Sequence, residues 1–317
     1  IVSHIHLSLL FAVVLLLPLP VRAITSSYYN SINGQKETAL RNALYTITSA
    51  GPSGMSYDGL WTAYQTTDVY PSDSTGKEGK IWDMYSDCLF TPTGKGDGKQ
   101  CGTYSSVCDC FNREHSLPKS WFNEKTPAYY DLGHIVPTDG KVNGMRSNYV
   151  FGECASGYAT WGTGKLGKAK AVTTMNVKGS STITTTFTGT AFEPADKYKG
   201  DFARMYMYMV IRYKPGNSNS VNLAAAGEGQ KMFNSTDTNY GLTDYSIALL
   251  MKWHRQDPVS QKEIDRNNGM ETTQGNRNPF IDYPCLAEYL WGNKAGQAVT
   301  LSELVGTFTG SWTSGDG

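Results

Sequence analysis

The chain has 317 residues, and its 28 basic and 28 acidic side chains give a formal net charge of zero. A neutral chain lacks the long-range positive field of a tight, stoichiometric nucleic-acid-binding module. Any nucleic-acid site must therefore depend on a local cluster of residues or on a metal ion. Such a site suits an enzyme that turns over its substrate better than a protein that only binds it.

Residues 1–23 are expected to be an export signal. Residues 8–19 are almost entirely apolar, and this run is too short to span a bilayer comfortably. Small residues follow at the positions that a signal peptidase reads, Val21 and Ala23. The alternative is an ordinary buried N-terminal helix. Because Arg22 is the only charged residue of the segment, the mature chain would carry one excess acidic group.

The next two segments differ in character. Residues 35–65 have the apolar spacing of a helix, which Gly51 and Pro52 interrupt and residues 57–64 resume. Residues 70–110 are rich in Gly, Asp, Lys and Ser and contain four of the six cysteines. We expect strands and loops there that are held together covalently.

An even number of cysteines in an exported chain favours disulfides. The candidates are Cys88, Cys101, Cys108, Cys110, Cys154 and Cys285. Cys108 and Cys110 are too close for an easy mutual bridge, so each is expected to pair with a more distant cysteine. The alternative is a zinc site that uses both of them and a histidine, but no second closely spaced pair completes it.

Residues 110–148 follow the order strand, loop, strand, helix. The polar run Asn112-Arg113-Glu114-His115 lies between apolar neighbours, residues 130–137 alternate polar and apolar side chains, and Asp139 is a plausible helix N-cap. This is the order of a ββα-metal finger, in which the first strand presents a general base and the helix presents a metal ligand.

The rest of the chain predicts one hairpin and several helices. Residues 172–177 and 183–192 alternate threonine with apolar residues and read as two strands joined by the four residues 178–181. Helices are expected at residues 201–213, 243–257 and 260–271, the first with Tyr and Met side chains that pack in the core. Together these elements predict an α+β, helix-rich single domain with small antiparallel sheets.

The catalytic domain is expected to span residues 24–292. Residues 293–317 are rich in Gly, Ser and Thr and resemble the start of a linker to a further module.

Few side chains can serve as a base, because the mature chain has only His115, His134 and His254. In a regular strand Glu114 and His115 point to opposite faces, but a bend near Pro118 would let both reach one solute. The carboxylate can then bind a hard cation while the imidazole faces a water. A structural histidine on a strand edge is the alternative reading of this run.

Here the sequence resembles the endonuclease I family of secreted bacterial nucleases, within the His-Me finger group. The resemblance runs from Tyr57 to Trp291. It is carried by residues 112–122 (NREHSLPKSWF), 137–149 (PTDGKVNGMRSNY), 192–206, 253–260 and 274–282. It implies that His115 is the general base and that Glu114 and Asn143 bind a divalent metal ion. Magnesium is the expected ion, with manganese and calcium as alternatives.

One departure from the family lies at Gly133, where a bulkier residue is common. It creates the run Asp131-Leu-Gly-His134, which looks like the motif of another finger-nuclease family with His134 as base. Asn143 follows His115 by 28 residues but His134 by only nine, which leaves no room for the second strand. We therefore expect His134 to pack within the finger and His254 to be structural.

The resemblance implies a secreted or periplasmic, metal-dependent and largely sequence-nonspecific endonuclease. It would cleave DNA, RNA or both to 5′-phosphate and 3′-hydroxyl ends, as a monomer away from membranes. Arg146 is the first choice for a phosphate contact; Arg204 and Arg277 are second choices that could equally form structural ion pairs. The rival interpretations are a non-catalytic carbohydrate- or protein-binding module and a different metal-dependent phosphodiesterase. The latter would usually show more histidines and carboxylates.

Overall fold

The computed structural model describes residues 27–49, 55–161, 164–218 and 220–305. The predicted export signal, the Gly51-Pro52 interruption and residues 306–317 lie outside these ranges. Among the described residues, no helix is both long and apolar enough to cross a bilayer. The helices are α1 (Glu37–Ser49), α2 (Gly59–Thr67), α3 (Gly140–Arg146), α4 (Lys199–Arg212), α5 (Gly229–Met232), α6 (Asp244–Gln256), α7 (Gln261–Gln274), α8 (Pro279–Asp282), α9 (Leu286–Leu290) and α10 (Leu301–Val305). The strands are β1 (Ile81–Trp82), β2 (Leu89–Phe90), β3 (Lys99–Gln100), β4 (Cys110–His115), β5 (Ile135–Asp139), β6 (Val150–Phe151), β7 (Cys154–Trp161), β8 (Gly164–Ala169), β9 (Val172–Val177), β10 (Ser181–Thr185) and β11 (Thr190–Glu193).

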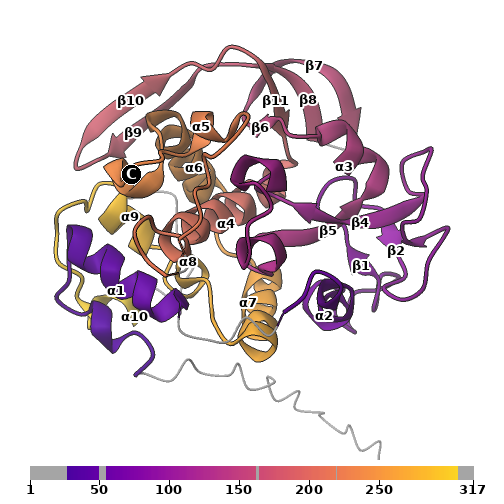
Figure 1. The fold of residues 1–317 in the computed structure, drawn as a ribbon, viewed down its shortest axis with the longest axis horizontal. Helices are drawn as coiled ribbons and strands as arrows, with labels where there is room; N and C mark the ends of the chain where they lie inside the picture. The colour runs from indigo at the N-terminus through magenta and orange to yellow at the C-terminus, as the bar shows by residue number, and fades with distance from the viewer. Residues whose placement is uncertain (1–26, 50–54, 162–163, 219, 306–317) are drawn as a thin grey trace, which may run out of the picture.

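Helix α4 forms the centre of the core. All of its residues are buried, and it packs against α1, α6 and α8. The finger strands lie on one side of it and α1 and α9 on the other (Figure 1). The prediction that its tyrosines and methionines pack in the core is confirmed, because Met207, Tyr208 and Met209 have no exposed surface.

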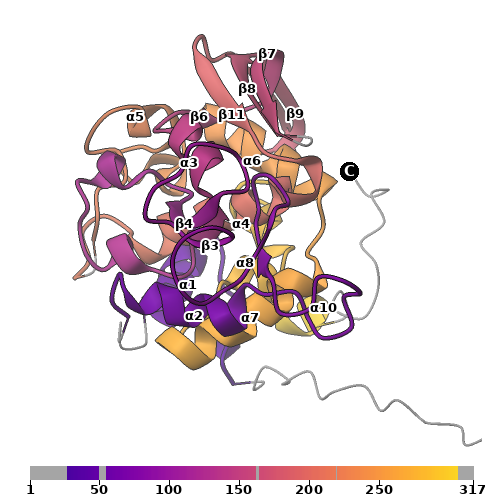
Figure 2. The ribbon, with the colours of Figure 1, turned by 90° about the vertical axis from the view of Figure 1, so that its right-hand side faces the viewer.

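The strands form several small sheets, as an α+β fold predicts. One has the order β6-β11-β8-β7 and another the order β3-β4-β5, and β1-β2 and β9-β10 are two-stranded. Most neighbours are antiparallel, but β3-β4 and β6-β11 are parallel. In Figure 2 the β7-β8 hairpin and α3 lie toward one end of the molecule, whereas α2 and α7 lie side by side at the other.

The predicted ββα order is present. Strand β4 pairs with β5 in antiparallel register, with His115 opposite Ile135 and Phe111 opposite Asp139. Helix α3 follows β5 directly, and the Asp139 carboxylate accepts the backbone N–H of Val142, as an N-cap does. Helix α3 packs against β4, and Asn143 on α3 lines the same cavity as Glu114 of β4.

Two disulfides close the segment before this finger. Within the described part of the chain, Cys88 bonds to Cys108 and Cys101 bonds to Cys110. The prediction that Cys108 and Cys110 each find a distant partner is confirmed. Cys154 and Cys285 are buried and take no part in these two bridges, although both are among the disulfide candidates of the sequence. A small domain gains stability from such links because they restrict its unfolded chain.

The predicted hairpin is correct in its first strand and wrong in its second. Strand β10 ends at Thr185, and the connection from Val177 has three residues. Ala191 and Phe192 belong instead to β11, which pairs with β8 and β6. The exposed face of the β7-β8 hairpin carries few apolar residues, so the sequence does not predict this hairpin.

The later helices begin where their capping residues indicate. Thr243 caps α6, and Ser260 forms a capping box with Glu263 at the start of α7. After α9 the chain remains part of the fold as far as residue 305. Val299 is buried and exchanges backbone hydrogen bonds with Gly34 and Gln35.

Gly133 is required by close packing. A Cβ atom there would lie 2.3 Å from the Tyr208 ring, whose hydroxyl is held by Asp131 and Asn276. We expect Gly133→Ala to lower the free energy of unfolding by about 2 kcal/mol, because the ring cannot move without breaking these hydrogen bonds. Chemical denaturation measures the change. Gly102→Ala is the matched control, since a Cβ atom at Gly102 meets nothing within 4 Å; equal stability of both variants would contradict the prediction.

Candidate active site

A cavity of about 330 Å³ opens where the end of β4 meets α3. Its lining includes Glu114 and His115 from β4 and Asn143 and Arg146 from α3. In a regular strand Glu114 and His115 would point to opposite faces, but β4 ends at His115. Both side chains can therefore reach the cavity. The irregularity predicted near Pro118 is this end of the strand.

The imidazole of His115 is held in one orientation. Its Nε2 lies 3.0 Å from the backbone oxygen of Tyr129, and because a carbonyl only accepts, Nε2 carries the proton. No hydrogen bond reaches Nδ1 from the described part of the chain, so Nδ1 has the lone pair in the neutral ring. Burial holds the pKa of His115 well below its usual range, and His134 acts in the same direction.

Aromatic rings surround this imidazole on its other sides. The rings of Tyr57 and Tyr129 stack on it at centroid distances of 5.7 and 5.3 Å. Tyr57 and Tyr129 also lie 4.7 Å from each other. This packing restricts the rotation of His115 and leaves the cavity side of the ring for a solute.

Glu114 is buried and has one oxygen in use. Its Oε1 accepts hydrogen bonds from the Tyr85 hydroxyl at 2.7 Å and from Arg146 at 2.6 Å. No hydrogen bond from the described residues reaches Oε2. Burial raises the pKa of Glu114, and Arg146 opposes that shift.

Arg146 lies in the cavity wall, but its guanidinium is committed to the protein. It is 1% exposed, and besides Glu114 it donates to the backbone oxygens of His115 and Ser116 at 2.9 and 2.6 Å. A phosphate would have to displace these partners. The geometry therefore makes Arg146 a positioning residue for Glu114 and the strand end rather than a phosphate contact.

Arg204 and Arg277 do not line the cavity. Arg204 has no exposed surface and forms two hydrogen bonds to the Glu263 carboxylate. Arg277 pairs in the same way with Asp282. Both arginines fit the structural ion-pair alternative, and we do not include them in the site.

The other two histidines are buried elsewhere. His134 lies outside the cavity lining, its Nε2 donates to the backbone oxygen of Ala128 at 2.8 Å, and burial lowers its pKa to about 4. His254 contacts the backbone oxygen of Pro284, and burial, with Arg204 next in effect, lowers its pKa to about 3. Neither ring lies where a base for a solute in the cavity would be needed.

The residues at the cavity fit a hard divalent cation. Asn143 is partly exposed, and its side chain makes no hydrogen bond to another described residue. Together with Oε2 of Glu114 it offers two uncommitted oxygens at one cavity. Magnesium binds through one or two such protein oxygens and keeps most of its waters.

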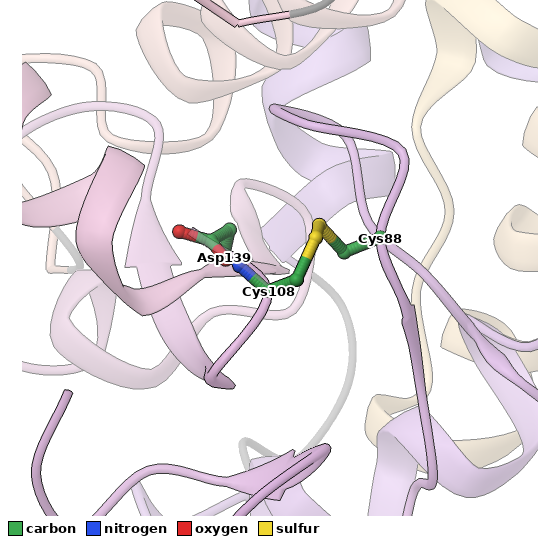
Figure 3. A group of neighbouring side chains, drawn as sticks. All are labelled: Cys88, Cys108 and Asp139. Carbon is green, nitrogen blue, oxygen red and sulfur yellow. Dashed lines mark hydrogen bonds between the residues drawn. A yellow bond between two sulfur atoms is a disulfide. The ribbon is translucent and has the colours of Figure 1, made fainter. Parts of the chain in front are cut away.

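A second group, Cys88, Cys108 and Asp139, has ligand-type atoms close together (Figure 3). The two sulfurs are bonded to each other and are not thiolates, and the Asp139 carboxylate accepts the backbone N–H groups of Cys108 and Val142. We assign this group to structure. The zinc alternative with Cys108 and Cys110 is wrong for the same reason, because both are in disulfides.

Sequence reasoning did not single out the cations that line the cavity. Arg113 stacks on the rings of Tyr57 and Trp61, at 3.5 and 4.4 Å from their centroids. The side chain of Lys119 is 43% exposed and lies over Tyr129. Both residues lie in the 112–122 motif that carries the family resemblance, and their place in that motif is the sequence feature from which they could have been predicted.

The chain is similar to known nucleases. A family model described as Endonuclease I matches residues 35–285. An extracellular ribonuclease of Bacillus amyloliquefaciens is 34% identical over 85% of this chain and 79% of its own length. An extracellular ribonuclease of Bacillus subtilis is 29% identical over 85% of this chain and 80% of its own length. A periplasmic deoxyribonuclease of Aeromonas hydrophila is 28% identical over 49% of this chain and 48% of its length.

The free energy of unfolding tests whether Arg146 holds the Glu114 carboxylate in place. We expect Arg146→Met to lower the free energy of unfolding by about 3–5 kcal/mol, because it leaves the buried Glu114 carboxylate without its cation. Arg113→Met is the control. The ion pair of Arg113 is with Asp58, whose side chain is 92% exposed, so the loss of this pair and of the stacking on Tyr57 and Trp61 should cost only about 1–2 kcal/mol. Wild-type stability of Arg146→Met would contradict the assignment.

The burial of His254 predicts a pH effect. Its folded pKa of about 3 lies below its unfolded value of about 6.5. Its contribution to stability is therefore complete above pH 6.5 and declines as the pH falls toward 3. Between pH 7.5 and 5 the wild type should lose about 2 kcal/mol from this group. Relative to His254→Gln, which does not titrate, the wild-type advantage should shrink by that amount in denaturation curves; a constant difference would refute the prediction.

Proposed function

Since the chain belongs to the endonuclease I family, we propose that the cavity between β4 and α3 is its active site, with His115 as general base. The protein acts as a secreted or periplasmic, metal-dependent endonuclease on phosphodiester bonds. One observation carries this proposal. Glu114 and His115 at the end of β4 and Asn143 on α3 line the same cavity, although 28 residues separate His115 from Asn143 in the sequence.

Glu114 and Asn143 are the residues that would hold the cation, through Oε2 and the side-chain amide oxygen. When bound, a divalent cation such as magnesium supplies positive charge that stabilises the phosphate and the departing 3′ oxygen. Tyr85 and Arg146 keep the carboxylate in place from its other oxygen. Manganese and calcium are alternative ions for the same oxygen ligands.

His115 takes the proton from the attacking water at Nδ1. Its Nε2–H stays on the Tyr129 carbonyl, which fixes the tautomer that a base requires. Attack on phosphorus breaks the bond to the 3′ oxygen, which takes a proton from a solvent water, and leaves 5′-phosphate and 3′-hydroxyl ends. Water and phosphate enter from the cavity, since the tyrosine rings cover the other sides of the imidazole.

We assign the positive charge that meets the substrate to Arg113 and Lys119, which line the cavity. Their ion-pair partners, Asp58 and Glu124, are exposed to solvent, unlike the buried partner of Arg146. Contacts between such cations and phosphates do not read bases, so cleavage is largely sequence-nonspecific. The similar proteins are named as ribonucleases and as deoxyribonucleases, so we include both RNA and DNA among the substrates. The protein acts as a monomer in this proposal.

A nuclease assay on plasmid DNA and on RNA, with and without a chelator, tests the function. Cleavage should require a divalent cation, and His115→Ala should lower it at least about 1000-fold while thermal stability changes little. His254→Gln replaces a buried imidazole outside the cavity and is the matched control that keeps activity. Retained cleavage by His115→Ala would refute the assignment of the base.

Cation binding can be measured without turnover. Titration calorimetry with manganese should show one site in the wild type and in His115→Ala. The site should be lost in Glu114→Gln, which removes the ionised ligand oxygen. Unchanged binding by Glu114→Gln would show that the cation lies elsewhere.

A further inference from the structure

Tyr104 is an exposed aromatic residue that does not line the cavity itself but lies close to two residues that do, Cys101 and Asn112, beside Gly140. It lies in the loop that the disulfide between Cys101 and Cys110 closes, and Cys101 itself lines the cavity. The tyrosine is 40% exposed although the loop around it is covalently held. An apolar ring in water is therefore kept in a defined place next to the site.

The ring lies along helix α3, the helix that carries Asn143. A Cβ atom on Gly140 would lie 3.0 Å from Cδ1 of Tyr104, and one on Gly144 would lie 2.5 Å from its hydroxyl oxygen. These two glycines are four residues apart and share one helix face. The absence of side chains on that face lets the ring approach the helix. The next residues after α3, Ser147 and Asn148, line the cavity.

Tyr104 differs from Tyr57 and Trp61, which line the cavity, because no other side chain of the described residues stacks on its ring. Arg113 covers Tyr57 and Trp61, and Tyr57 also packs on Tyr129. Among the described residues, no ring and no cation stacks on Tyr104, and its hydroxyl forms no hydrogen bond. It is thus a flat surface available to a solute that extends out of the cavity.

We propose that Tyr104 stacks on an unpaired nucleobase of the substrate and favours cleavage of single-stranded nucleic acid, RNA or DNA, over duplex. The inference rests on the proposed function, since the base belongs to the strand whose phosphate lies in the cavity. A base can stack on an exposed ring only if neighbouring bases do not cover its face. Bases in single strands meet this condition. Bases within a duplex already stack on one another, and their faces are not accessible to Tyr104.

The test compares three substrates of one non-self-complementary sequence: a single-stranded DNA oligonucleotide, the corresponding RNA, and the DNA duplex. In Tyr104→Ser the ratio of kcat/KM on each single strand to that on duplex should fall about tenfold, mainly through KM. Tyr104→Phe should keep the wild-type ratio, because stacking uses the ring and not the hydroxyl. An unchanged ratio in Tyr104→Ser, or equal losses on all three substrates, would overturn the inference.

Gly144→Ala provides an independent variant. Its added methyl group displaces the Tyr104 ring, while alanine favours the helix over glycine. The ratio should fall as in Tyr104→Ser although the melting temperature does not. Tyr158→Ser, at a 66% exposed tyrosine on β7, is the matched control and should leave the ratio unchanged. A wild type that cleaves none of the substrates would refute the proposed function, whereas cleavage with an unchanged ratio in both variants would refute only this inference.

Discussion

The geometry of the proposed active site depends on the buried ion pair between Glu114 and Arg146. Glu114 must be close to the cavity and largely removed from water, and an isolated carboxylate in that position would be costly. Arg146 offsets this cost with a 2.6 Å contact to Oε1. The same guanidinium also binds the carbonyl groups of His115 and Ser116. One side chain of α3 therefore holds the Glu114 carboxylate, the end of β4 and the backbone of His115, the proposed general base, together.

The cations around the cavity have two different roles. Arg146 on α3 pairs with Glu114 inside the protein, so in the proposed function the substrate phosphates bind other cations. Arg113 and Lys119 lie in the cavity lining and rest on tyrosine rings. A few such cations are compatible with zero net charge over the whole chain. They supply local attraction without the strong field that would retain the product.

Covalent and packing constraints keep this small site rigid. Both disulfides end in the segment that enters β4, and Asp139 receives the N–H of Cys108 as well as capping α3. From the other side Tyr206 of the fully buried helix α4 donates to the Ser116 carbonyl. The finger is thus supported by elements that lie before and after it in the chain. Preorganised ligands and base need such support, because small displacements weaken catalysis.

The sequence by itself determined the order strand, loop, strand, helix, the spacing between His115 and Asn143, and the resemblance to nucleases. These features are local or depend on residue types, so periodicity, capping residues and motifs reveal them. It could not assign the arginines, since the partner of each charge is distant along the chain: Glu114 is 32 residues from Arg146, and Arg204 is 59 residues from Glu263. Nor could it show that β10 ends before Phe192, because strand ends depend on which neighbour is available to pair. Only the tertiary structure decided which cations face the cavity, because burial and pairing are properties of the packed chain.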